Sequence, residues 1–135
     1  MDDAGARYAK NAGAVFSLKF HAVWCPKYRR PVLTAPVDAR LKEIISDIAA
    51  NREMIIHALD VRPDHLHLFI EIDPRWAPAE IVGKFKAVSS RLLRQEFPAL
   101  RSRLPTLWSR AYFIASVGAV CEATIRRYIE AQKGV

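Results

Sequence analysis

Two histidines, His65 and His67, stand two residues apart in the stretch RPDHLHLFIEI. Residues two apart on a β-strand point to the same face, so both imidazoles and Phe69 would share one face while the leucines between them enter a core. Two neutral imidazoles on one face can bind a divalent metal, but the site needs at least one more ligand. The pair therefore predicts part of a metal site, with chance spacing as the alternative.

A second set of candidate groups lies near the C-terminus, in the stretch EATIRRYIEAQKGV. Tyr128 and Gln132 are four residues apart, so on a helix they would lie one turn from each other on the same face. Gln132 could add an amide oxygen to the metal site and Tyr128 a phenol, provided that this helix lies over the histidine face. The alternative is that Ile125, Tyr128 and Ile129 only pack the helix onto the sheet.

The elements that must position these groups follow a regular order. Strands are predicted over 15–24, 54–61, 65–72 and 111–117, and helices over 36–51, from 78 to just before Pro98, and over 122–132. This order predicts an α+β fold of the ferredoxin-like (split βαβ) type, an antiparallel sheet with an additional C-terminal helix that carries Tyr128. The length of 135 residues fits one domain over 1–135, of which residues 1–13 are expected to be flexible.

Basic residues outnumber acidic ones, 21 against 14, which gives a net charge of +7. The segment from Lys84 to Arg110 contains seven Lys and Arg and a single acid, Glu96. A second cluster, Lys27–Arg30, mixes an aromatic ring with positive charge, as surfaces for single-stranded nucleic acids often do. Both clusters predict contacts with phosphates, and the alternatives are a solvated basic face and, for Lys27–Arg30, a structural turn.

Several classes of protein are not expected from this composition. The start, MDDAGARYAK, does not have the pattern of a signal peptide, and no apolar run approaches the roughly 18 residues of a membrane span. We therefore expect a soluble, cytoplasmic protein without a membrane partner. Cys25 and Cys121 lie far apart and lack the close pairing of structural zinc sites, so they are expected to be reduced thiols.

Four segments together resemble the single-tyrosine HUH transposases of the insertion-sequence 200/605 type, usually called TnpA. The segments are WCPKYRRPVL (24–33), PDHLHL (63–68), LWSRAYFIASVG (107–118) and YIEAQ (128–132). They occur in the family's order and at about its spacing, and the match runs over most of residues 15–132. Four linked motifs are far more specific than one His-x-His.

The resemblance implies a role for each candidate residue. His65 and His67 would be the histidines of the HUH motif, Gln132 the third protein ligand of a divalent metal, and Tyr128 the nucleophile that cuts single-stranded DNA and keeps a 5′ phosphotyrosine. Nitrogen and oxygen ligands without thiolate suit Mg²⁺ or Mn²⁺. The family also implies DNA hairpins as partners and a homodimer in which Tyr128 serves the other subunit. Gly118, just before the last helix, would let that helix swing away from its own sheet.

Two other functions are compatible with these residues. One is a related HUH nuclease that acts on chromosomal repeat hairpins. The other is a non-catalytic nucleic-acid-binding module, because RNA-recognition domains have a sheet of the same topology, although PDHLHL lacks their aromatic, Gly-rich pattern. The residues expected to contact DNA are Lys27, Tyr28, Arg29, Arg30, Lys84, Lys86, Arg91 and Arg94. His21 is interpreted as structural or DNA-facing and not as a ligand.

Overall fold

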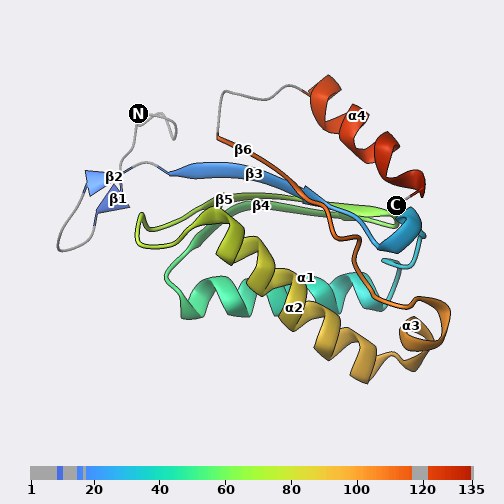
Figure 1. Ribbon diagram of the computed structural model, residues 1–135. Coiled ribbons are helices and arrows are strands. Elements are labelled where there is room, and N and C mark those ends of the chain that lie inside the picture. The colour runs from blue at the N-terminus through green and yellow to red at the C-terminus, as the bar shows by residue number, and fades with distance from the viewer. Residues whose placement is uncertain (1–8, 11–14, 17, 117–121, 135) are drawn as a thin grey trace.

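The computed structural model describes residues 9–10, 15–16, 18–116 and 122–134 of the chain (Figure 1). Its main sheet contains four antiparallel strands in the order β4-β5-β3-β6. These strands are β3 (Lys19–Trp24), β4 (Ile55–Arg62), β5 (His65–Glu71) and β6 (Phe113–Ser116). The order is that of the ferredoxin-like fold, which confirms the predicted fold class.

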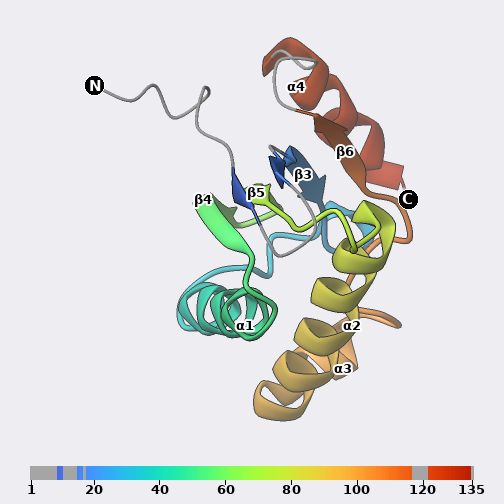
Figure 2. The same cartoon turned by 90° about the vertical axis from the view of Figure 1, so that its left-hand side faces the viewer.

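Helices cover both faces of the main sheet. They are α1 (Val37–Asn51), α2 (Pro78–Glu96), the short α3 (Pro98–Arg103) and α4 (Glu122–Ala131), which continues into the 3₁₀ turn η3 (Gln132–Gly134). Figures 1 and 2 show α1 and α2 on one face and α4 on the opposite face. Among the described residues, no helix combines the length and the apolar character that crossing a membrane requires.

The strand that carries the histidine pair lies inside the sheet, between β3 and β4. Its residues Leu66 and Leu68 are completely buried in a core that includes residues of α1 and α2. Burying each leucine side chain contributes about 1.5–3 kcal/mol, and a register slip of one residue would turn both leucines out of the core. The packing of the leucines therefore fixes the histidines on the face toward α4.

The observed elements differ from the predicted ones in three places. The predicted strand over 15–24 is divided into β2 (Val15–Phe16), which pairs with β1 (Ala9–Lys10), and β3 in the main sheet. Helix α2 ends before Pro98 as predicted, but α3 follows at once, because a proline is well tolerated at the first position of a helix. The last strand is shorter than predicted. Its expected end at residue 117, Gly118, Cys121 and most of residues 1–13 lie outside the described residues.

Candidate functional site

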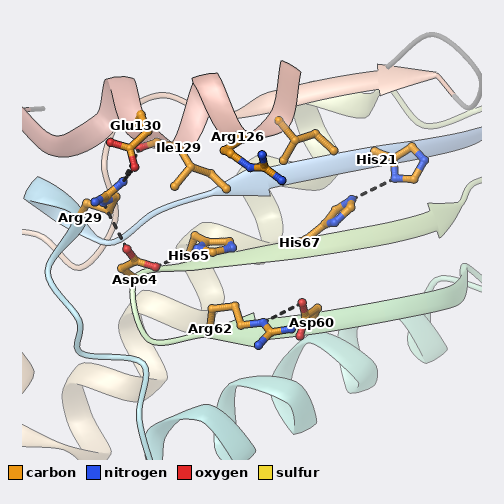
Figure 3. Close-up of a pocket in the computed structure, with 11 residues that line it drawn as sticks. His21, Arg29, Asp60, Arg62, Asp64, His65, His67, Arg126, Ile129 and Glu130 are labelled. Carbon is orange, nitrogen blue, oxygen red and sulfur yellow. Dashed lines mark hydrogen bonds and ion pairs between the residues drawn. The ribbon is translucent and has the colours of Figure 1, made fainter. Parts of the chain in front are cut away.

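A cavity of about 810 Å³ separates the sheet from α4 (Figure 3). The strands and the turn between them contribute His21, Asp60, Arg62, Asp64, His65 and His67 to its wall. The helix contributes Ile125, Arg126, Ile129 and Glu130, and Arg29 lies at one end. The predicted histidine pair therefore lies in a concave site beneath the helix that carries Tyr128.

The first residue of β5, His65, is oriented by the residue before it. Its Nδ1 lies 2.8 Å from Oδ1 of Asp64 (Figure 3). A carboxylate can only accept this hydrogen bond, so the ring proton is on Nδ1 and the lone pair of Nε2 is available. A carboxylate on the second ring nitrogen is the usual partner of a metal-binding histidine, because it fixes both the tautomer and the ring orientation. His65 is thus well prepared to act as a ligand.

The second histidine, His67, contacts another histidine. Its Nε2 lies 3.0 Å from Nδ1 of His21 on β3, and the His21 ring stacks on Phe69 with 4.9 Å between centroids. Burial lowers the pKa of His67, and the neighbouring His21 lowers it further; burial also lowers the pKa of His21. Both rings are therefore neutral at pH 7, and the neutral imidazole is the form that binds metal.

Tyr128 lies on α4 but does not line the cavity. Its ring packs against Phe113, with 5.7 Å between centroids, and its hydroxyl is buried without a hydrogen-bond partner among the described residues. Burial, with a smaller contribution from Cys25, raises the pKa of Tyr128 well above its usual value. Cys25 itself is a buried free thiol, as expected. In this position the phenol is protonated and shielded from any substrate.

Gln132 also does not line the cavity. Its side chain is buried, and its Oε1 accepts a 3.2 Å hydrogen bond from Oγ of Ser109. The imidazoles of His65 and His67 suit a divalent metal, but no group of three or more His, Cys, Asp and Glu side chains in the described part of the chain could hold one. A third protein ligand of a metal here would therefore be of another residue type, such as Gln132 after a movement, or would come from outside these residues.

Two of the predicted DNA contacts on α2 are engaged within the protein. Nζ of Lys86 donates hydrogen bonds of 2.8, 3.1 and 3.3 Å to the carbonyl oxygens of residues 109, 110 and 111, and its burial lowers its pKa. Arg94 donates to the carbonyl oxygen of Leu104 at 3.2 Å. Lys84 and Arg91, in contrast, are exposed on the same helix. The exposed pair is available to a phosphate backbone.

The predicted cluster Lys27–Arg30 also divides into inward and outward side chains. Tyr28 is 44% exposed, and the Lys27 ammonium lies 5.1 Å from the centre of its ring. Arg30 is exposed as well. Arg29 points into the protein and forms ion pairs with Asp64 and Glu130 at 3.2 Å each (Figure 3). The outward ring and charges of this cluster can meet DNA, whereas Arg29 connects parts of the protein.

The position of His21 beside His67 did not follow from the sequence reasoning. Alternation along residues 15–24 assigned His21 to a strand face, but it gave no information on which strand would be its neighbour. The pairing of β3 with β5, which places His21 opposite Phe69, brings the two imidazoles together. The useful signal would have been the ferredoxin-like strand order itself, because it makes the first and third strands of the main sheet adjacent.

Comparisons with known proteins identify relatives of this chain. The family described as "Transposase IS200 like" matches residues 14–132. The ISDra2 transposase TnpA of Deinococcus radiodurans is 37% identical over 125 residues, which cover 91% of this chain and 89% of the relative. The transposase for insertion sequence element IS200 of Salmonella typhimurium is 28% identical over 119 residues, covering 87% of this chain and 78% of the relative.

Two solved structures are similar in fold. One is a crystal structure from Deinococcus radiodurans of a protein assigned as a transposase, with a TM-score of 0.85, 34% identity, and coverage of 94% of this chain and 99% of that chain. The other is a REP-associated tyrosine transposase bound to a REP hairpin, with a TM-score of 0.56, 14% identity, and coverage of 96% and 69%. The second likeness concerns the fold alone. The family match over residues 14–132 and the relative at 37% identity establish that the chain belongs to the IS200-like transposases.

Proposed function

We propose that this protein cuts and rejoins single-stranded DNA at the ends of an insertion sequence, with Tyr128 as the nucleophile. Membership of the IS200-like transposases implies DNA cleavage and strand transfer. The observation that carries the proposal is the pair His65 and His67, which lie in one cavity beneath the helix that bears Tyr128. One imidazole is oriented by Asp64, which suits it to act as a ligand.

The histidines and Gln132 would hold Mg²⁺ or Mn²⁺ in this mechanism. When bound, such an ion supplies Lewis-acid polarisation of the phosphate oxygens. Asp64 keeps the proton of His65 on Nδ1, so that Nε2 can act as the donor. The shifts of the pKa values of His21 and His67 favour neutral rings, so His67 does not need to lose a proton before it binds.

The tyrosine chemistry conserves the energy of the DNA backbone. The phenolic oxygen of Tyr128 attacks phosphorus, the phenolic proton leaves, and the bond from phosphorus to the 3′ oxygen breaks. The products are a 5′ phosphotyrosine and a free 3′ hydroxyl. The 3′ hydroxyl of another strand can then displace Tyr128, which forms a new phosphodiester and regenerates the phenol. No nucleotide cofactor is consumed.

Tyr128 and Gln132 must leave their present positions for this reaction. They are close together in the chain and neither lines the cavity, so a movement of α4 and η3 would relocate them together. We propose that they act on the His65 and His67 of the other subunit in a homodimer. The buried positions of the phenol and the amide support this proposal, because neither group reaches the cavity of its own subunit as the helix now lies.

The DNA partner in this proposal is a single strand with hairpins near the ends of the element. Its backbone would contact the exposed residues Tyr28, Arg30, Lys84 and Arg91, and also Lys27, which is half-buried. A hairpin-bound tyrosine transposase has the same fold, which supports a hairpin ligand. A nuclease for chromosomal repeats is the second candidate, but that relative shares only 14% identity with this chain, so we prefer the insertion-sequence function.

The test is covalent trapping. The protein is incubated with Mn²⁺ and a single-stranded oligonucleotide that spans an element end with its hairpin, and the denatured products are separated by gel electrophoresis. We expect a protein–DNA adduct that peptide mass spectrometry maps to Tyr128. A binding module would yield no adduct, and an adduct on Tyr112 or Tyr28 would refute the assignment. Full Mn²⁺ affinity of a His65→Ala/His67→Ala variant, measured by calorimetry, would refute the metal site.

A further inference from the structure

Arg29 lies where three separate parts of the protein meet. It belongs to the 3₁₀ turn η2 (Lys27–Arg29) that follows β3. Its Nε lies 3.2 Å from Oδ2 of Asp64, in the turn between β4 and β5. Its Nη1 lies 3.2 Å from Oε1 of Glu130 and donates to the carbonyl oxygen of Ile129 at 3.3 Å, both on α4 (Figure 3). One guanidinium thus joins the histidine strand to the tyrosine helix.

The backbone around Arg29 has an unusual conformation. Tyr28 and Arg29 have φ values of 60° and 53°, in the left-handed region that non-glycine residues rarely adopt. The Arg29 side chain is only 14% exposed, whereas its neighbour Arg30 is an exposed residue. Two adjacent arginines of the same motif therefore have different surroundings, one within the protein and one in solvent.

The contact with Asp64 acts on the metal-ligand candidate. One oxygen of the Asp64 carboxylate accepts from Nδ1 of His65 and the other pairs with Arg29. Because both oxygens are engaged, the carboxylate cannot rotate away without losing one partner. Arg29 therefore holds the group that determines the tautomer and ring orientation of His65.

The contacts with Ile129 and Glu130 act on the tyrosine helix. Both residues lie in the last turn of α4, directly beside Tyr128 in the chain. A cation at this end of a helix binds unpaired carbonyl oxygens and the negative end of the helix dipole. The same guanidinium therefore keeps α4 over the cavity, and in this position the Tyr128 hydroxyl and Gln132 are buried.

We propose that Arg29 is a positioning residue that couples the orientation of His65 to the docking of α4. The consequence of this coupling for catalysis rests on the proposed function. If α4 moved away, Tyr128 would be released, and the restraint that Arg29 and Asp64 place on His65 would change at the same time. It also distinguishes Arg29 from Arg30 within the KYRR cluster. Arg29 acts through other residues of the protein, and Arg30 contacts DNA.

The test compares Arg29→Lys with Arg30→Ala in the full chain without metal or DNA. Lysine keeps the charge but cannot reproduce the fork of contacts made by a guanidinium. Arg29→Lys should increase amide hydrogen exchange in α4 at least fivefold and reduce the Nδ1-protonated tautomer of His65, seen in its ring ¹⁵N shifts. Arg30→Ala should change neither. If Arg29→Lys does not fold, Glu130→Gln replaces it in the same two measurements. The Glu130 side chain is 58% exposed, so this change is made at an exposed position.

A second comparison separates positioning from DNA contact. Arg29→Lys should weaken Mn²⁺ binding about tenfold, as loss of a group that orients a ligand does, and leave the salt dependence of hairpin binding unchanged. Arg30→Ala should leave Mn²⁺ binding unchanged and reduce the logarithmic salt slope by about one. Unchanged exchange in α4 or an unchanged His65 tautomer in Arg29→Lys would overturn the coupling. Because these two readouts need no metal or DNA, they decide the role of Arg29 even if no DNA adduct forms. Absence of the adduct would count against the proposed function alone.

Discussion

Ser109 donates a 3.2 Å hydrogen bond to Oε1 of Gln132, and the two residues are 1% and 7% exposed. This bond engages the amide oxygen of Gln132, the candidate third metal ligand. Ser109→Ala removes the restraint, which is worth about 1 kcal/mol for a typical hydrogen bond. We expect Mn²⁺ affinity to rise by roughly fivefold, the factor that corresponds to this free energy, as measured by calorimetry.

A double variant provides the control for this prediction. Ser109→Ala combined with Gln132→Ala should show no gain in Mn²⁺ affinity, because the released amide oxygen is then missing. If Ser109→Ala alone leaves the affinity unchanged or weakens it, Gln132 is not a restrained ligand of the histidine site.

Tyr128→Phe should separate stability from catalysis. The Tyr128 hydroxyl is buried without a partner among the described residues, so its removal deletes an unsatisfied polar group and keeps the contact with Phe113. We expect the free energy of unfolding to stay the same or to rise by about 1 kcal/mol, measured by urea denaturation. The DNA adduct should disappear completely. A loss of several kcal/mol would show that the hydroxyl has a partner, and a persisting adduct would exclude Tyr128 as the nucleophile.

The sequence was sufficient to predict the strand that bears the histidines but not their full surroundings. The alternation in HLHLFIE depends on local geometry, so both the strand and its two faces could be predicted, and β5 begins at His65 as expected. The predicted fold makes β3 and β5 adjacent, but the contact of His21 with His67 also depends on the register between these strands. The orientation of Tyr128 depends on how α4 docks. Helical spacing places Tyr128 and Gln132 together, but it cannot say which side of the helix meets the cavity.

The pKa shifts in the histidine cluster predict how stability depends on pH. In the folded, metal-free protein the pKa values of His21 and His67 are lowered, whereas in the unfolded chain a histidine has a pKa near 6.5. The unfolded chain therefore binds more protons than the folded protein at pH values between the unfolded pKa and the folded pKa values. The free energy of unfolding should therefore be at its full value above about pH 6.5 and fall as the pH drops through the folded pKa values. Urea denaturation at a series of pH values measures this loss.

The matched variant for the pH experiment is His21→Gln/His67→Gln. It removes both shifted groups, so its stability should fall less between about pH 6.5 and 5 than that of the wild type. Equal losses in the two proteins would mean that acid destabilises the fold through other groups.

Two basic residues of α2 should respond differently to removal of their charge. Lys86→Met leaves three carbonyl oxygens without their donor and should reduce the free energy of unfolding by about 1–3 kcal/mol. Arg91→Ala, at an exposed position, should leave stability unchanged and reduce the logarithmic salt slope of DNA binding by about one or less. Denaturation and salt titration of both variants measure the two effects. An unchanged slope in Arg91→Ala would indicate an ordinary solvated face.

The proposed homodimer makes a prediction about two inactive variants. Tyr128→Phe lacks the nucleophile, and His65→Ala lacks a metal ligand, so each should form no DNA adduct by itself. In a mixture that forms heterodimers, the crossed arrangement creates one site with His65 from the first variant and Tyr128 from the second. The other site lacks both groups. We therefore expect adduct formation to return at up to about half of the wild-type amount per heterodimer.

The alternative arrangement gives a different result in the same experiment. If each Tyr128 acts in its own subunit, both sites of the heterodimer lack one essential group and the mixture stays inactive. Different affinity tags on the two variants allow the heterodimer to be isolated and its formation verified. The adduct should form only on the His65→Ala chain, since that chain alone carries Tyr128, and mass spectrometry can assign it. A verified heterodimer without adduct, under conditions in which the wild type reacts, would exclude the crossed arrangement for the cleavage step.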